Sequence, residues 1–261
     1  MSTATMVTHE FGYVRKVMTR NPQALFFTIG LPLLYLFIFA TVFGSEHEHL
    51  AGQPGTLKVS TALVASVMVI GVVSAAFQFL AGTLVNDREA GILKRLRSAP
   101  VPTATFLSGY LINSILTSAL LAVLVAALGR VVYGVPLPSA HVLAAVLTVL
   151  VGAFACCALA FAITIPIRKA TTATALVPAI TLTLFFLSGN FFSLEAAPAG
   201  LRAVANVFPV RHFYQAMVTA FNPHVTGSGL ALEHLGILAL WGVAGLALAA
   251  WKFRWTPAGD E

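Results

Sequence analysis

Long apolar runs separated by short polar stretches dominate this chain. A helix rises about 1.5 Å per residue, so about 20 apolar residues cross a hydrocarbon core of roughly 30 Å. Six runs are long enough, and the pattern predicts an all-α integral membrane protein with a six-helix bundle. Pro32 and Pro178 fall inside two of them and predict kinks rather than ends. The expected spans are residues 24–43, 60–85, 102–129, 141–165, 173–192 and 235–251.

The composition supports lipid as the solvent of this chain. Of 261 residues, 58% are hydrophobic and 9% are charged, whereas soluble domains average about 25% charged. We expect one membrane domain over residues 1–261. The formal charge of +6 is not gathered in a soluble basic run, so no nucleic-acid partner is predicted. Cys156 and Cys157 are adjacent in an apolar run and are interpreted as helix-packing residues.

The basic residues indicate the orientation of the spans. If the amino terminus is inside, 11 of the 15 Lys and Arg residues lie at cytoplasmic ends. This bias predicts that both termini are cytoplasmic. The first span exceeds the apolar core of about 7–15 residues typical of a signal peptide, and no cleavage-type sequence follows it. The eleven residues are Arg15, Lys16, Arg20, Arg88, Lys94, Arg95, Arg97, Arg168, Lys169, Lys252 and Arg254.

Residues 8–20 have the pattern of an amphipathic helix lying in the membrane surface. Asn21 and Pro22 then fit the cap and first residue of a new helix. A frayed amino-terminal tail is the alternative. The apolar positions are Phe11, Val14, Val17 and Met18, and the basic positions are Arg15, Lys16 and Arg20.

Residues 86–100, between the second and third spans, predict a short cytoplasmic helix. Asn86 and Glu89 have capping-box spacing, acids come first, bases come last, and Pro100 ends the run. An apolar ridge of Ile92, Leu93 and Leu96 could enter a groove on a cytoplasmic protein. The alternative is a helical turn that only joins two spans.

The stretch DREAGILKRLRSAPVP resembles the motif after the second span in type-2 ATP-binding-cassette (ABC) permeases, particularly the daunorubicin-resistance-like drug- and lipid-exporting branch. In that family it is the coupling helix, which docks in a groove of the ATPase subunit. Ile92 and Lys94 stand where the family often has Thr and an acid or Gln, so the docking surface is more basic here. The resemblance implies docking by Asp87, Arg88, Glu89, Gly91, Leu93, Leu96 and Pro100.

The resemblance also implies the partners and the location. We expect two nucleotide-binding ATPase subunits, a second permease subunit that is a copy or a paralogue, and a bacterial cell membrane. The sequence has no phosphate-binding loop, so ATP and Mg²⁺ are expected on the partner and no cofactor on this chain.

Residues 194–234 are too apolar for a free outer loop and predict two short helices broken near Pro209, at the interface or re-entering the bilayer. The stretch FPVRHFYQAMVTAFNP resembles the family's re-entrant helices, although Thr219 replaces a common basic residue. An interfacial aromatic anchor with a snorkelling arginine is the alternative. The candidates for an outer gate are Phe208, Pro209, Arg211, Phe213 and Tyr214.

Within the expected spans, Gln78 and Asn113 are the polar candidates for a pathway. No Asp, Glu or Lys lies there, so the energy for transport is expected from a partner. Residues 46–49, Glu-His-Glu-His, lack a further ligand nearby, and no metal site is predicted.

Together these features predict the permease subunit of an ATP-driven exporter, without catalytic residues of its own. The apolar, aromatic-rich spans favour a lipophilic or amphiphilic substrate. Two alternatives remain at this stage: an integral membrane enzyme acting on lipids, and an anchoring subunit without a pathway.

Overall fold

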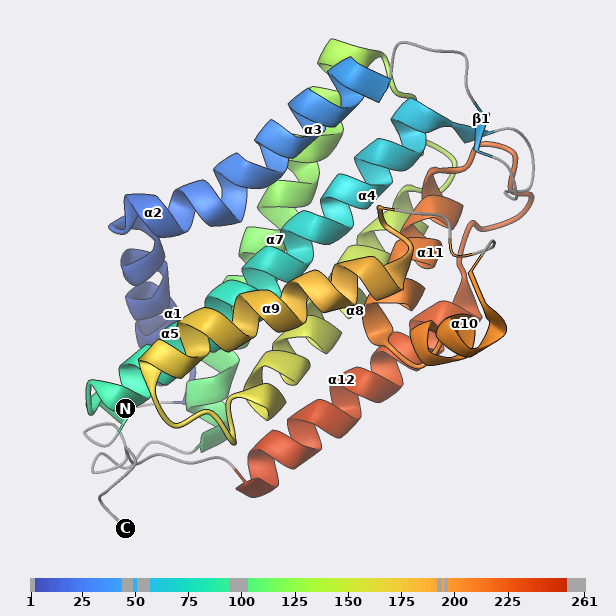
Figure 1. The fold of residues 1–261 in the computed structure, drawn as a ribbon. Coiled ribbons are helices and arrows are strands. Elements are labelled where there is room, and N and C mark those ends of the chain that lie inside the picture. Colours follow the sequence, from blue (N-terminus) through green and yellow to red (C-terminus); the bar gives the residue numbers. More distant parts are fainter. Residues whose placement is uncertain are drawn as a thin grey trace.

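The computed structural model describes residues 3–43, 49–50, 57–93, 103–191, 194 and 197–252. In this part of the chain, six helical stretches are long and apolar enough to cross a membrane, as the sequence predicts. They lie side by side in one bundle (Figure 1). The stretches are α2 (Pro22–Leu25), η1 (Phe26–Gly30) and α3 (Leu31–Phe43); α4 (Val59–Val73), η2 (Ser74–Phe79) and α5 (Leu80–Glu89); α7 (Thr103–Tyr133); α8 (Val142–Ile163); α9 (Ala170–Ser188); and α12 (Leu232–Lys252).

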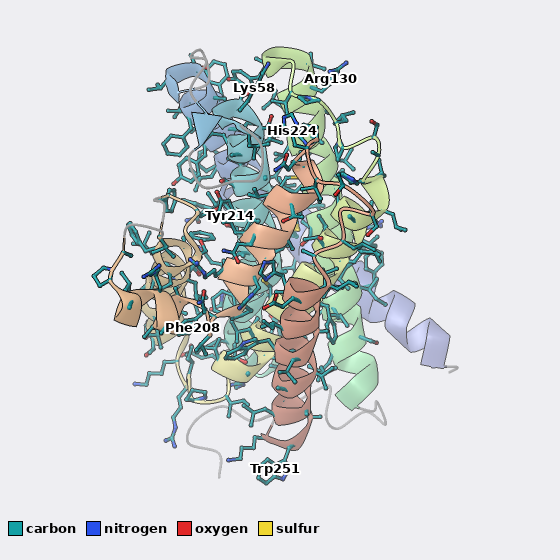
Figure 2. The ribbon with its side chains drawn as sticks, turned by 90° about the vertical axis from the view of Figure 1, so that its right-hand side faces the viewer. Lys58, Arg130, Phe208, Tyr214, His224 and Trp251 are labelled. Carbon is teal, nitrogen blue, oxygen red and sulfur yellow. The ribbon has the colours of Figure 1, made fainter. Side chains whose placement is uncertain are left out.

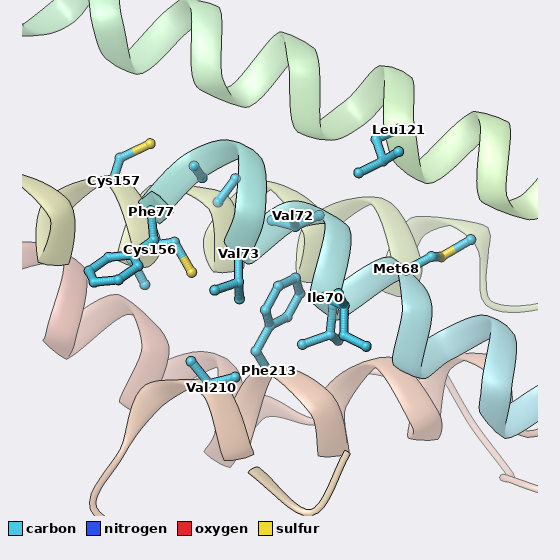
Figure 3. Close-up of a cluster of buried hydrophobic side chains, with 14 of the residues drawn as sticks. Met68, Ile70, Val72, Val73, Phe77, Leu121, Cys156, Cys157, Val210 and Phe213 are labelled. Atoms are coloured by element: carbon cyan, nitrogen blue, oxygen red, sulfur yellow. The ribbon is translucent and has the colours of Figure 1, made fainter. Parts of the chain in front are cut away.

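The second span is the centre of the bundle. Most of its side chains from Thr61 to Arg88 are buried, whereas the other spans leave many large apolar side chains exposed, as lipid-facing helices do. Figure 3 shows part of the core, where Ile70 and Val73 of α4 lie beside Phe213. A movement of this span therefore reaches most of its neighbours.

Two π-helical segments interrupt the first two spans. In η1, the amide of Leu31 donates to the carbonyl of Phe26, five residues earlier, whereas an α-helical amide donates to the carbonyl four residues earlier. Leu31 directly precedes Pro32. Because proline lacks an amide hydrogen, a local change of hydrogen bonding here lets the helix continue. Pro178 also lies inside a continuous helix, α9. Both prolines thus leave their helices unbroken, as predicted.

The amino-terminal segment forms α1 (Thr3–Thr19) and then turns sharply into the first span. Val14 and Met18 are buried, while the basic side chains predicted for the other face are exposed. Asn21 Oδ1 accepts a hydrogen bond from the amide of Ala24 (3.0 Å), and Pro22 follows as the first helical residue. Figure 2 shows α1, in pale blue, extending away from the bundle. The helix and the cap at Asn21 are therefore as predicted, and the placement of α1 in the membrane surface stays a prediction.

A two-stranded antiparallel pair, β1 (His49–Leu50) and β2 (Leu57–Lys58), precedes α4 and was not predicted. Residues 46–48 of the Glu-His-Glu-His stretch lie outside the described residues. Within the described ranges, no group of three or more His, Cys, Asp and Glu residues could hold a metal ion.

Helices α8 and α12 approach closely at Gly245. A Cβ atom built there would lie 2.9 Å from the backbone carbonyl of Ala158. Because backbone cannot rotate away as a side chain does, Gly245→Ala should push the two helices apart. We expect thermal unfolding in lipid nanodiscs to show a loss of about 2 kcal/mol, the scale of an overpacked contact.

Gly236, on the same helix, has no atom within 4 Å of a built Cβ, and it is the matched control. Gly236→Ala should leave stability unchanged or raise it by up to about 1 kcal/mol through helix propensity. Equal stabilities for the two variants would contradict the close approach.

Candidate functional site

The end of the second span departs from the sequence prediction. A new helix does not begin at Asn86; instead α5 continues to Glu89. Gly91 then adopts a left-handed conformation (φ 71°), and its amide donates to the carbonyl of Arg88 (3.1 Å). Glycine adopts this conformation without the steric strain that it causes in other residues, and a left-handed glycine commonly ends a helix. The acid-base-acid triplet 87–89 is therefore the last turn of the span.

Asp87 joins this turn to two other helices. The residue is buried, with 7% of its surface exposed. Its Oδ2 accepts a 2.5 Å hydrogen bond from the hydroxyl of Tyr110 on α7, and its Oδ1 accepts a 3.3 Å bond from the hydroxyl of Tyr13 on α1. A buried carboxylate needs such donors, and here they come from the surface helix and the third span.

Arg88 joins the same turn to the connection between α8 and α9. The residue is 3% exposed, and Nη1 of its guanidinium donates to the carbonyls of Thr164 (2.8 Å) and Ile167 (3.1 Å). Thr164 is the C-cap of α8, so the cation lies where the helix dipole is negative. The charge therefore stabilises both the end of α8 and the turn that follows.

Glu89 completes the triplet at the start of α9. Its Oε2 accepts a hydrogen bond from the amide of Ala170, the first residue of that helix. Carboxylates are favoured at helix amino termini because the free amides and the dipole attract them. We call Tyr13, Asp87, Arg88, Glu89, Tyr110 and the turn at residues 164–170 the junction.

The junction changes how the predicted docking residues are interpreted. Asp87, Arg88 and Leu93 are buried within the chain, and Leu93 has no exposed surface. Glu89 is exposed and Gly91 is half-buried. Leu96 and Pro100 lie outside the described residues. The docking role of the segment stays a prediction.

At the opposite end, which we call the distal end, two short helices follow α9. They are α10 (Ala199–Ala205) and α11 (Pro209–Phe221). Phe208 between them is extended (φ −82°, ψ 138°). The predicted break near Pro209 is therefore confirmed. Figure 2 shows α11 rising from Phe208, well inside the bundle, toward the end that carries Lys58 and Arg130.

The predicted gate residues occupy different environments. Phe213 is fully buried, and a side chain on Gly152 of α8 would clash with its ring, so it is not an interfacial anchor. Pro209 is also buried, while Phe208, Arg211 and Tyr214 are half-buried. Tyr214 shares a side-chain hydrogen bond with Ser66 of α4. A gating role for this segment stays a prediction.

The two polar pathway candidates lie on neighbouring elements. Gln78 is half-buried in η2, and Asn113 is 3% exposed on α7, which packs against η2. Among the described residues, the Nδ2 atom of Asn113 has no hydrogen-bond partner. Their role in a pathway stays a prediction.

Sequence reasoning missed Tyr13 and Tyr110, the partners of Asp87. Tyr110 lies within an apolar run, and a buried tyrosine usually has a hydrogen-bond partner. Its position could therefore have predicted a polar partner for its hydroxyl. Sequence reasoning also missed the contact between His212 and His234, whose Nδ1 atoms are 3.0 Å apart. Their separation along the chain follows no helical spacing, and the sequence carries no signal for it.

The fold and the junction define a polytopic helical membrane protein that concentrates its buried charges at one end of the bundle. Residues 12–222 match the family model described as ABC-2 type transporter, and the chain belongs to that family. It is thus the membrane component of an ABC transporter and not itself an enzyme, which removes the lipid-enzyme alternative. No curated protein is similar enough to this chain to be a match.

Proposed function

We propose that this chain is the permease subunit of an ATP-driven exporter that moves a lipophilic or amphiphilic substrate out of the cytoplasm or the inner leaflet. ATP and Mg²⁺ bind to separate nucleotide-binding subunits, two per transporter. Two permease subunits, identical or paralogous, frame the pathway. Membership of the ABC-2 family and the apolar, aromatic-rich spans support this proposal.

The junction is the observation that carries the mechanism. The predicted docking segment, residues 86–100, includes the turn at Asp87–Glu89, and that turn is bonded to α1, α7, α8 and α9. When the ATPase closes and pushes this segment, the load passes through these hydrogen bonds to all four helices. A push on the turn therefore shifts the balance between inward- and outward-facing arrangements.

The charge distribution supports an orientation in a bacterial cell membrane with the junction in the cytoplasm. Arg15, Lys16, Arg168 and Lys169 are exposed, and all lie near the junction in the fold. The beginning of α1 and the end of α12 lie at the same end of the bundle (Figure 1). In this orientation α10 and α11 face the outer side, where the segment Phe208–Tyr214 gates release.

Co-purification from native membranes tests the coupling role. The wild-type chain should bring down a vanadate-sensitive ATPase in lipid nanodiscs. Ile92→Asp should lose that ATPase activity at equal membrane abundance, because Ile92 is half-buried and belongs to the apolar ridge of the docking segment. Leu93→Asp is unsuitable, since it would bury a charge.

The matched control is Leu232→Asp, which adds the same charge to a residue that is 72% exposed at the distal end. This variant should retain the ATPase. If Ile92→Asp retains it as well, the docking assignment fails, and if the wild-type chain recovers none, the anchoring-subunit alternative is favoured.

A further inference from the structure

Two histidines meet between α11 and α12, in the first turn of each helix. The Nδ1 atoms of His212 and His234 are 3.0 Å apart, and their ring centroids are 5.1 Å apart. The Nε2 atom of His212 lies 2.7 Å from the carbonyl oxygen of Asn206, in the turn between α10 and α11. His212 is 5% exposed. The pair therefore bonds this turn to the last span.

The hydrogen bonds determine the arrangement of protons in the neutral pair. A carbonyl oxygen only accepts, so Nε2 of His212 must carry the hydrogen that it donates to Asn206. A neutral imidazole carries one hydrogen, which leaves Nδ1 of His212 as an acceptor. His234 must then donate from its own Nδ1.

Added protons change the pair in two steps. With one proton added, one Nδ1 still donates and the other still accepts, so the bond survives. With both rings protonated, two N–H groups and two positive charges face each other at 3.0 Å, and the bond cannot form. Imidazole is the side chain whose charge ordinarily changes between about pH 5 and 8.

The same turn is attached to α12 a second time. Nε1 of Trp241 donates to the carbonyl of Val207 (2.9 Å). Because Asn206 and Val207 are consecutive, the two contacts hold one short stretch of backbone. If the histidine bond were lost, the hydrogen bond from Trp241 to Val207 would still join that stretch to α12.

Few other charges act on the pair. Arg211 and Glu233, the neighbours of the two histidines in sequence, are the charged groups near His234. Arg202 on α10 is exposed. Helices α4, α8 and α9, which also pack against α11, contain no Asp, Glu, Lys, Arg or His. We therefore expect the effect of pH on this contact to come from protonation of the two histidines themselves.

We propose that His212 and His234 form a proton-sensitive latch. It holds the turn between α10 and α11 against α12 while at least one ring is neutral, and it releases the turn when both rings are protonated. In the orientation proposed above, acid on the outer side opens the latch. The latch itself does not depend on the ATPase partner or on the identity of the substrate.

Distance measurements by pulsed electron paramagnetic resonance test the latch in the full chain in nanodiscs. Spin labels are placed at Val204→Cys on α10 and Val131→Cys on α7, which are 50% and 83% exposed. One main distance is expected near pH 8, and a second population is expected near pH 5. A chain without introduced cysteines controls for labelling of Cys156 and Cys157, both buried.

His234→Asn is the informative variant, because an asparagine amide occupies the place of Nδ1 and can donate or accept. It should keep the pH 8 distance at both pH values. A phenylalanine at this position cannot form the hydrogen bond to His212, so His234→Phe should show the second distance population at both pH values. His141→Gln, at another histidine that contacts the carbonyl of Gly227, should behave as the wild type.

The latch is overturned if the wild-type distances are the same at both pH values. It is equally overturned if His234→Asn shows the acid response of the wild type, because the proton would then act elsewhere. Failure of His234→Phe to fold would leave both of these comparisons intact.

Discussion

Replacing Arg88 by methionine is expected to uncouple the partner ATPase from the membrane helices and to lower the free energy of unfolding by about 3 kcal/mol. The reason is that two buried carbonyls, those of Thr164 and Ile167, lose the hydrogen bonds that the guanidinium donates to them. Hydrogen bonds to a charged group are worth about 1.5–3 kcal/mol each, and unsatisfied buried acceptors cost a similar amount. Methionine fills much of the vacated volume, so the loss of unfolding free energy comes from the missing guanidinium rather than from a cavity.

Two measurements separate stability from coupling. Thermal unfolding in nanodiscs gives the stability loss, and the ATPase rate of the assembled transporter, with and without the permease, gives the coupling. Arg88→Lys should recover part of both, since an ammonium carries the charge but has a less suitable geometry for two separated carbonyls. Arg168→Met is the matched control, because Arg168 is exposed in the same turn; it should change neither quantity. Equal effects at the two positions would mean that net charge, not the buried contacts, matters.

The six spans could be predicted from the sequence because length and apolar composition alone decide whether a segment can cross lipid. The observed helices begin and end within a few residues of the expected bounds. The cap at Asn21 and the break at Pro209 could also be predicted, since both depend on residues that are adjacent in the chain. Local rules were sufficient wherever the deciding contacts were local.

The turn at residues 86–89 shows where local rules fail. Asn86 and Glu89 have capping-box spacing, but Glu89 instead caps α9, 81 residues further along. Asp87 and Arg88 likewise bond to residues 74 and 76 positions away. These distant partners outweigh a capping contact worth about 1 kcal/mol. Asp87 and Arg88, two of the charges that indicated a docking surface, are therefore buried, and no periodicity in the chain reveals their partners.

Removing a single hydroxyl at Tyr110 is expected to have the second-largest effect. Tyr110→Phe leaves the ring in place and deletes the 2.5 Å hydrogen bond to Asp87. Tyr110 has no exposed surface, so no water replaces the hydroxyl without rearrangement. We expect a loss of about 2 kcal/mol in unfolding free energy and a clear fall in permease-dependent ATPase stimulation.

Tyr13→Phe provides a comparison within the same site, because it removes the same atom from the same carboxylate. Its bond is longer, 3.3 Å, and only partly buried. We expect a loss below about 1 kcal/mol, since water can take the place of the hydroxyl at a partly exposed position. If the two variants lose equal stability, the difference in burial between the two tyrosines does not control the strength of the junction.

A double-mutant cycle with Asp87→Asn assigns the effect to the pair. An asparagine accepts a weaker hydrogen bond than a carboxylate, so Tyr110→Phe should cost less in the Asp87→Asn chain than in the wild type. Residues in contact commonly show interaction energies of about 0.5–3 kcal/mol, and a value near zero would show that Tyr110 acts through another neighbour. If stability and ATPase stimulation fall together across the cycle, the bond between α5 and α7 transmits the push from the ATPase. If stability falls and stimulation does not, the bond supports the fold alone, and transmission must pass through Arg88 and Glu89.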